Sequence, residues 1–156
     1  MFDVVLWQPE IPPNTGNLMR LTVNTGCRLH LIEPLGFDLD DARMRRAGLD
    51  YKEFATVKLH PSFDAYVKDV EPERVFAYTQ SGTTTYTDID YYEGDSLLFG
   101  RESDGLAADV MHHDAVTERV RIPIADGGRS LNLANAAAIG VFEAWRQNGF
   151  GSADRF

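Results

Sequence analysis

The sequence predicts an α/β fold in which a mostly parallel sheet is flanked by helices. The first observation is that short apolar runs typical of buried strands alternate with segments of helical periodicity. The second is that a glycine-bearing loop at 100–106 follows an expected strand and precedes an expected helix, as ligand-binding loops of α/β folds do. With 156 residues, the chain has the size of one ordinary domain, and we expect a single domain over residues 1–156.

The first half of the chain begins with an apolar run at 2–7, which predicts a buried strand, followed by a proline-rich loop at 9–13. Asn14 is the expected N-cap of a helix that runs to about residue 24, with Gly26 directly after its C-terminus. The remaining expected elements of this half are a strand at 28–33, a short helix from Asp40 or Asp41 to about Gly48, a weak strand at 55–59 and a helix at 62–70.

The second half predicts strands at 74–79, 96–99 and 119–124, and the first two are separated by a polar, threonine-rich loop. Helices are expected at 106–112 and at 130–147. The last helix carries no charged side chain until Glu143, which is unusual for a helix that only covers a sheet. Its apolar face predicts either simple core packing or a homodimer interface formed with the helix at 14–24. The residues expected on this face are Leu131, Ala138, Val141, Phe142 and Trp145.

Composition narrows the class of protein. No apolar run approaches the roughly 20 residues that span a bilayer, and the N-terminus lacks the basic start of a signal peptide. Cys27 is the single cysteine, so an intrachain disulfide is excluded. These features predict a cytoplasmic protein with no membrane partner.

The charge is strongly acidic overall but uneven. The formal net charge of −9 disfavours general polyanion binding, and residues 88–118 hold nine acidic residues and one basic one. Basic residues gather instead in the first third of the chain. They either solvate a helix face or form a local RNA-binding patch, whose members would be Arg43, Arg45, Arg46 and Lys52.

Polar side chains cluster on the first turns of the last expected helix. A core helix rarely carries residues such as Ser130, Asn132 and Asn135 there without using their hydrogen bonds, which indicates a ligand site. The loop at 100–106 is either a ligand loop or a structural turn, and it matches neither a dinucleotide-binding nor a Walker A motif. The four histidines have no metal-ligand spacing, so we expect no metal site.

Taken in order, three segments resemble the motifs of the SPOUT class of RNA methyltransferases, and most closely its small TrmL/YibK-like members. They are Pro-Glu-Ile-Pro-Pro-Asn-Thr-Gly-Asn-Leu-Met-Arg at 9–20, Leu-Phe-Gly-Arg-Glu-Ser-Asp-Gly-Leu at 98–106, and the segment from Arg129 to Gln147. The resemblance implies a sheet whose C-terminal segment forms a deep trefoil knot. It also implies 2′-O-methylation of the wobble nucleotide of tRNA, cytidine or uridine at position 34.

The resemblance also assigns residues. S-adenosylmethionine, which leaves as S-adenosylhomocysteine, would bind without metal at Tyr78, Gly100, Ile122, Ser130 and Leu131. The implied catalytic set is Arg20, Asn14, Glu102, Ser130 and Asn132. A guanidinium stays protonated, so we expect Arg20 to bind phosphate or stabilise the developing alkoxide rather than act as a base.

Two residues differ from common family members: Ser81 stands where lysine is found, and Asp104 where arginine or lysine is frequent. Both remove positive charge near the expected RNA path. Two other functions stay open at this point, a 2′-O-methyltransferase for another tRNA or ribosomal RNA position and a catalytically silent RNA-binding knot protein.

Overall fold

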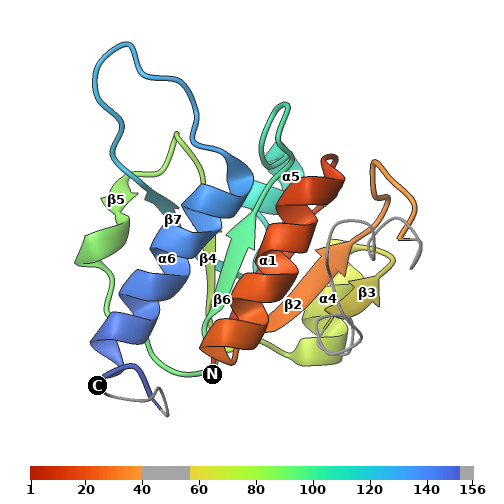
Figure 1. Ribbon diagram of the computed structural model, residues 1–156, viewed down its shortest axis with the longest axis horizontal. Helices are drawn as coiled ribbons and strands as arrows, with labels where there is room; N and C mark the ends of the chain where they lie inside the picture. Colours follow the sequence, from red (N-terminus) through yellow and green to blue (C-terminus); the bar gives the residue numbers. More distant parts are fainter. Residues whose placement is uncertain (40–56, 152–156) are drawn as a thin grey trace.

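A computed structural model describes residues 1–39 and 57–151, which form a seven-stranded sheet with helices on both faces (Figure 1). The strand order is β3-β2-β1-β6-β4-β7-β5, and each of these neighbouring pairs is parallel. The predicted fold class is therefore confirmed. The knot that the resemblance implies stays a prediction.

The strands are short, and five of the seven were expected close to where they lie. Their bounds are β1 Asp3–Trp7, β2 Arg28–Ile32, β3 Val57–His60, β4 Val75–Tyr78, β5 Thr84–Thr85, β6 Ser96–Phe99 and β7 Val116–Arg121. The strand predicted at 119–124 was placed three residues too late, and β5 in the threonine-rich segment was missed. The helices are α1 Pro12–Thr25, α4 Phe63–Val70, α5 Ala108–Met111 and α6 Leu133–Gln147, with a 3-10 turn at Tyr86–Asp88.

Two hydrophobic cores result from the alternation of side chains along the central strands. Val4 and Leu6 of β1 face the side covered by α1 and α6, whereas Val5 and Trp7 face the side covered by α4 and α5. Helices α1 and α6 lie next to each other over the same sheet face (Figure 1). The amino ends of both helices therefore lie at the edge of the sheet where the parallel strands end.

Local capping explains where several helices begin and end. Ser62 accepts a hydrogen bond from the backbone N–H of Ala65 and starts α4, as predicted. Gly26 ends α1 with a φ of 70°, a left-handed conformation that suits glycine, which was also predicted. Asn132 caps α6, so this helix begins at Leu133 and not at residue 130.

The expected role of Asn14 as a helix cap is wrong. Helix α1 begins at Pro12 after Ile11, and no side chain caps its N-terminus. Asn14 lies within the first turn, buried, with its amide directed away from the helix toward other loops. Proline has no backbone N–H, so a proline at the start of the helix leaves one fewer N–H group that needs a cap. The Asn14 side chain is therefore available for long-range contacts.

A buried polar cluster joins the strands at the other side of the sheet. His30 contacts Asp3 at 3.2 Å through Nε2 and His60 at 2.9 Å through Nδ1. Burial lowers the pKa of His60, and the neighbouring His30 lowers it further. Burial alone would raise the pKa of Asp3, but hydrogen bonds from His30 and Arg28 outweigh it and lower the pKa. These pKa shifts favour the charged carboxylate of Asp3 and the neutral form of His60.

The helix predicted from Asp40 or Asp41 to about Gly48 lies outside the described residues. Within residues 1–39 and 57–151, no helix is long and apolar enough to cross a membrane.

Candidate active site

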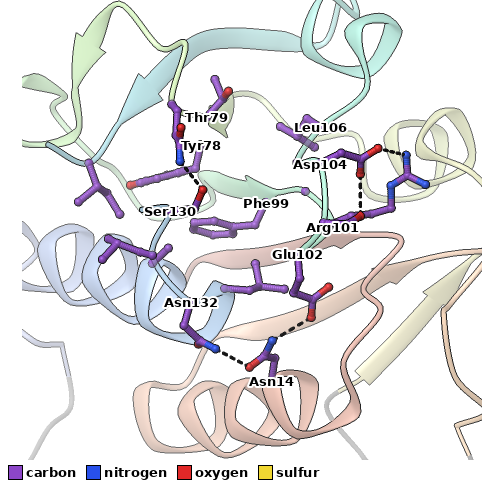
Figure 2. A pocket seen from close by; sticks show the side chains of 18 of the residues that line it. Asn14, Tyr78, Thr79, Phe99, Arg101, Glu102, Asp104, Leu106, Ser130 and Asn132 are labelled. Atoms are coloured by element: carbon purple, nitrogen blue, oxygen red, sulfur yellow. Dashed lines mark hydrogen bonds and ion pairs between the residues drawn. The ribbon is translucent and has the colours of Figure 1, made fainter. Parts of the chain in front are cut away.

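A cavity of about 820 Å³ opens at the carboxyl ends of β4, β6 and β7, beside the amino end of α6 (Figure 2). Ligands of open parallel sheets bind at this edge, and the volume suits a molecule of nucleoside size. The structure places all five residues predicted to bind cofactor around this cavity. They are Tyr78, Gly100, Ile122, Ser130 and Leu131.

Tyr78 forms one wall of the cavity and is held on three sides. Its ring stacks on Phe99 at 4.6 Å between centroids, and its hydroxyl lies 2.8 Å from that of Tyr91. Gly140 of α6 packs so closely that a Cβ there would lie 2.8 Å from the Tyr78 hydroxyl oxygen. Burial raises the pKa of Tyr78 well above its usual value, so this phenol stays protonated and is not a base.

Gly100 lets two backbone segments touch at the mouth of the cavity. A Cβ at Gly100 would lie 2.2 Å from the carbonyl carbon of Gly105, a distance that no other residue type tolerates. Arg101 and Gly105 exchange backbone hydrogen bonds at 3.0 Å, and Gly105 has a φ of 73°. The loop after β6 is therefore a tight turn that exposes its side chains around the cavity.

The three motif segments meet through a chain of hydrogen bonds (Figure 2). The Glu102 carboxylate accepts from the Glu10 N–H at 2.8 Å, the Ile11 N–H at 3.1 Å and the Asn14 side chain at 3.0 Å. Asn14 in turn accepts from the Asn132 side chain at 2.8 Å. Asn132 also accepts the backbone N–H groups of Ala134 and Asn135, which begin α6.

This chain gives three of the predicted catalytic residues a structural part. Glu102, Asn14 and Asn132 form hydrogen bonds to one another and to backbone groups. They therefore fix the loops after β1 and β6 against the start of α6. They are positioning residues in this structure, and any direct contact with substrate stays a prediction.

Glu10 is a second carboxylate in the site that the sequence did not indicate. Its side chain accepts from the backbone N–H and the hydroxyl of Ser103, each at 3.0 Å, so the two loops bind each other reciprocally. Gly36 packs on Glu10 so closely that a Cβ at Gly36 would lie 2.8 Å from the Glu10 Cα. The only available signal was an acidic residue within the rigid loop at 9–13, which by itself predicts no partner.

Ser130 lies on the segment between β7 and α6 and faces the loop after β4. The Gln80 side chain donates a hydrogen bond to the Ser130 hydroxyl across the cavity. Gln80 also lines the cavity, although the sequence did not mark it. This bond joins the loop after β4 to the segment between β7 and α6.

Arg20 does not line the cavity. It is exposed on α1, six residues after Asn14, which corresponds to about 9 Å along the helix axis. A substrate that contacts both the cavity and Arg20 must therefore extend over the start of α1. The four cations of the expected RNA patch, Arg43, Arg45, Arg46 and Lys52, lie outside the described residues.

Titratable side chains near the cavity do not form a metal site. Across residues 1–39 and 57–151, no three histidine, cysteine, aspartate or glutamate side chains gather closely enough to hold an ion. The arrangement instead offers an aromatic wall, backbone groups at strand ends and a few fixed polar side chains. Such a site orients a bound nucleoside and a second reactant.

Comparison with known proteins gives consistent relationships. Residues 1–142 match the SpoU rRNA Methylase family. A tRNA (cytidine(34)-2′-O)-methyltransferase of Aeromonas hydrophila is 55% identical over 150 residues, which cover 96% of each chain. A structure described as giving insights into the 2-OH methylation of C/U34 on tRNA is 41% identical, with a TM-score of 0.87, over 96% of this chain and 97% of that one.

A third comparison concerns the cofactor. The SpoU methyltransferase AviRb from Streptomyces viridochromogenes, in complex with AdoMet, is 26% identical with a TM-score of 0.81. That similarity covers 96% of this chain and 61% of the AviRb chain. The family match spans most of the sequence, and the motif segments that it includes meet around one cavity. The chain therefore belongs to the SpoU rRNA methylase family.

Proposed function

We propose that this protein transfers a methyl group from S-adenosylmethionine to the ribose 2′-hydroxyl of nucleotide 34, the wobble nucleotide, in tRNA. The observation that carries the proposal is the meeting of the three motif segments around a single nucleoside-sized cavity. Relatives named tRNA (cytidine(34)-2′-O)-methyltransferase at 55% identity supply the substrate. Such an enzyme works where tRNA is, in the cytoplasm.

The residues present fit the cofactor. The cavity has room for an adenosine with a methionine side chain, Tyr78 and Phe99 give it an apolar aromatic wall, and strand-end backbone groups surround it. Tyr78, Gly100, Ile122, Ser130 and Leu131 would hold the cofactor. When bound, it supplies a methyl group already activated on a positively charged sulfur.

The protein's part in the reaction is alignment and charge stabilisation. A ribose hydroxyl is a weak nucleophile, so the reacting atoms must be held in line at short distance. The Glu102–Asn14–Asn132 chain keeps the walls of the site in register for this purpose. Arg20 would bind the substrate phosphate or stabilise the oxygen as its proton leaves, because its guanidinium stays charged.

Arg20→Ala tests that role. Loss of one charge-stabilising group commonly slows turnover by about 10² to 10³. The variant should keep its affinity for S-adenosylhomocysteine, since Arg20 lies outside the cavity lining. Near-normal turnover would remove Arg20 from the mechanism.

We also propose a homodimer through α1 and α6. Exposed apolar side chains on or beside these helices are Ile11, Val23, Leu131 and Phe142, between 38% and 47% accessible. Val141, which the sequence placed on this face, is completely buried in the core and does not take part. Phe142→Asp should shift sedimentation to the monomer or cause aggregation, and a well-folded monomer of the parent protein would rule the dimer out.

RNA would approach along the cations Arg43, Arg45, Arg46 and Lys52. On an acidic protein, a few clustered cations should make tRNA binding strongly salt dependent. Replacing both Arg45 and Arg46 with glutamate should abolish tRNA methylation and leave cofactor affinity unchanged. Unchanged methylation would mean that RNA reaches the site by another route.

The direct test uses tRNA from cells that lack this modification and S-adenosylmethionine with a labelled methyl group. The expected result is label on the 2′-oxygen of nucleotide 34, located by nuclease digestion and mass spectrometry. Label at another tRNA position or on ribosomal RNA would assign a different substrate. Binding of tRNA without any transfer would indicate a catalytically silent RNA-binding protein.

A further inference from the structure

Arg101 is the first side chain after Gly100 and lies at the rim of the cavity (Figure 2). It is the only lysine or arginine among the side chains that line the cavity in the described part of the chain. Glu102 and Asp104 line the same rim, and Glu10 lies next to them. A polyanionic RNA that reaches this site therefore meets one cation within an acidic surrounding.

The guanidinium of Arg101 lies over an aromatic ring. Its central carbon lies 4.9 Å from the centroid of Trp7, at the end of β1, and Trp7 itself is buried. This contact is a cation–π interaction, which holds the guanidinium beside the cavity. The N–H donors lie along the edges of the guanidinium.

One of these edges is occupied by an exposed carboxylate. The Arg101 Nη2 donates to Asp104 Oδ2 at 2.9 Å, and the side chains are 32% and 60% accessible. Of five N–H donors, this is the one with an acceptor among residues 1–39 and 57–151. The Nε is buried without a partner there, so an incoming phosphate would be bound through the remaining Nη donors. The guanidinium therefore has unused donors and a partner that is weakly held, because exposed ion pairs contribute little.

The two carboxylates beside Arg101 differ in how they are bound. Glu102 accepts three hydrogen bonds from the neighbouring loop and the Asn14 amide, and turning toward another group would break them. Asp104 contacts only side chains of its own loop, Arg101 and Ser103, in the described structure. Of the two, Asp104 is the one that can move without disturbing the positioning chain.

We propose that Arg101 binds a phosphodiester group of the substrate RNA, and that Asp104 occupies this position until the RNA replaces it. A phosphate presents the same planar pair of oxygens to a guanidinium as a carboxylate does, so one anion exchanges for another. The stacking on Trp7 keeps Arg101 in place during the exchange. This inference rests on the proposed function, because it requires RNA to be the substrate.

The exchange explains how a site with an acidic rim accepts RNA. Asp104 neutralises Arg101 in the free protein and lowers its attraction for unrelated anions. A phosphate that is delivered together with a correctly placed ribose displaces the carboxylate. Arg101 is thus a residue that positions the substrate, and Asp104 sets the threshold for binding.

A double-mutant cycle tests the competition directly. The measured quantities are the tRNA dissociation constant at several salt concentrations and the affinity for S-adenosylhomocysteine by calorimetry. Arg101→Gln should weaken tRNA binding by about tenfold or more, as loss of a charged hydrogen bond does, and lower the log–log salt slope by about 1. Asp104→Asn should strengthen tRNA binding by about two- to fivefold, the worth of an exposed ion pair.

The decisive comparison is Asp104→Asn in the Arg101→Gln background. If Asp104 competes with the RNA for Arg101 as proposed, the gain in tRNA affinity should fall to the gain that Asp109→Asn gives. Asp109 is an exposed aspartate of α5 that changes the charge equally without contacting Arg101. An undiminished gain in the double variant would show that Asp104 acts by long-range repulsion alone, and the proposal would be overturned.

Two further outcomes are informative. Loss of S-adenosylhomocysteine affinity in Arg101→Gln, with unchanged tRNA affinity, would place Arg101 on the cofactor and contradict the proposal. Failure of the parent protein itself to bind or methylate tRNA would contradict the proposed function instead. Thermal unfolding of each variant shows whether a change in binding comes from damage to the fold.

Discussion

Replacing Glu102 with glutamine should destabilise the protein by about 2–4 kcal/mol, because the carboxylate accepts three hydrogen bonds that hold the site together. Oε1 accepts the Ile11 N–H and the Asn14 amide, and Oε2 accepts the Glu10 N–H. A glutamine keeps one oxygen and turns its NH₂ toward a third donor. One charge-assisted bond is then lost, and two others become neutral bonds.

The assay is thermal and urea unfolding of the parent and the variant under the same conditions. For a chain of this length, the expected loss corresponds to a fall in Tm of about 4–16 °C. Asp104→Asn is the matched control, because it removes the same charge from the same loop. The Asp104 carboxylate is 60% accessible, so its loss should cost less than about 1 kcal/mol. Equal stability of Glu102→Gln and Asp104→Asn would refute the positioning role of Glu102.

Other parts of the structure give two further predictions. Gly140→Ala should lower the stability by about 1–2 kcal/mol net and should also lower cofactor affinity, because the new methyl group would lie 2.8 Å from the Tyr78 hydroxyl. An unchanged calorimetric affinity for S-adenosylhomocysteine would contradict this packing. His60 has a lowered pKa in the folded protein because of burial and the neighbouring His30, so the unfolded chain binds more protons below pH 6.5. The urea midpoint should therefore fall as the pH drops from about 6.5 toward that lowered pKa, and the midpoint of the His60→Gln variant should fall less steeply. Identical slopes for the two proteins would show that other groups control the acid sensitivity.

The sequence predicted the parts of the fold that depend on local patterns. Buried strands such as β6 have continuous apolar runs, and α4 follows a serine cap, so both were found where they lie. Strand β7 alternates polar and apolar residues and carries charges, which moved its predicted bounds toward Pro123. Strand β5 has two residues and no apolar run, so periodicity could not reveal it.

The sequence predicted only those residues of the candidate site that lie in or near the motifs. The contacts that organise it join positions about 90 residues apart, such as Asn14 with Glu102 and Glu10 with Ser103. A local reading therefore assigned Asn14 to a helix cap and gave Glu10 no role. Long-range pairing depends on which strand ends become neighbours in the sheet, and the spacing of residues does not encode that order.

The cofactor site can be located in a crystal structure of the protein with S-adenosylhomocysteine. We expect the ligand in the cavity at the ends of β4, β6 and β7, in contact with Tyr78, Gly100, Ile122 and Ser130. We also expect the Glu102–Asn14–Asn132 hydrogen bonds to stay intact when the ligand is bound. Binding outside these loops, or no binding at millimolar ligand, would contradict the assignment of this cavity as the cofactor site.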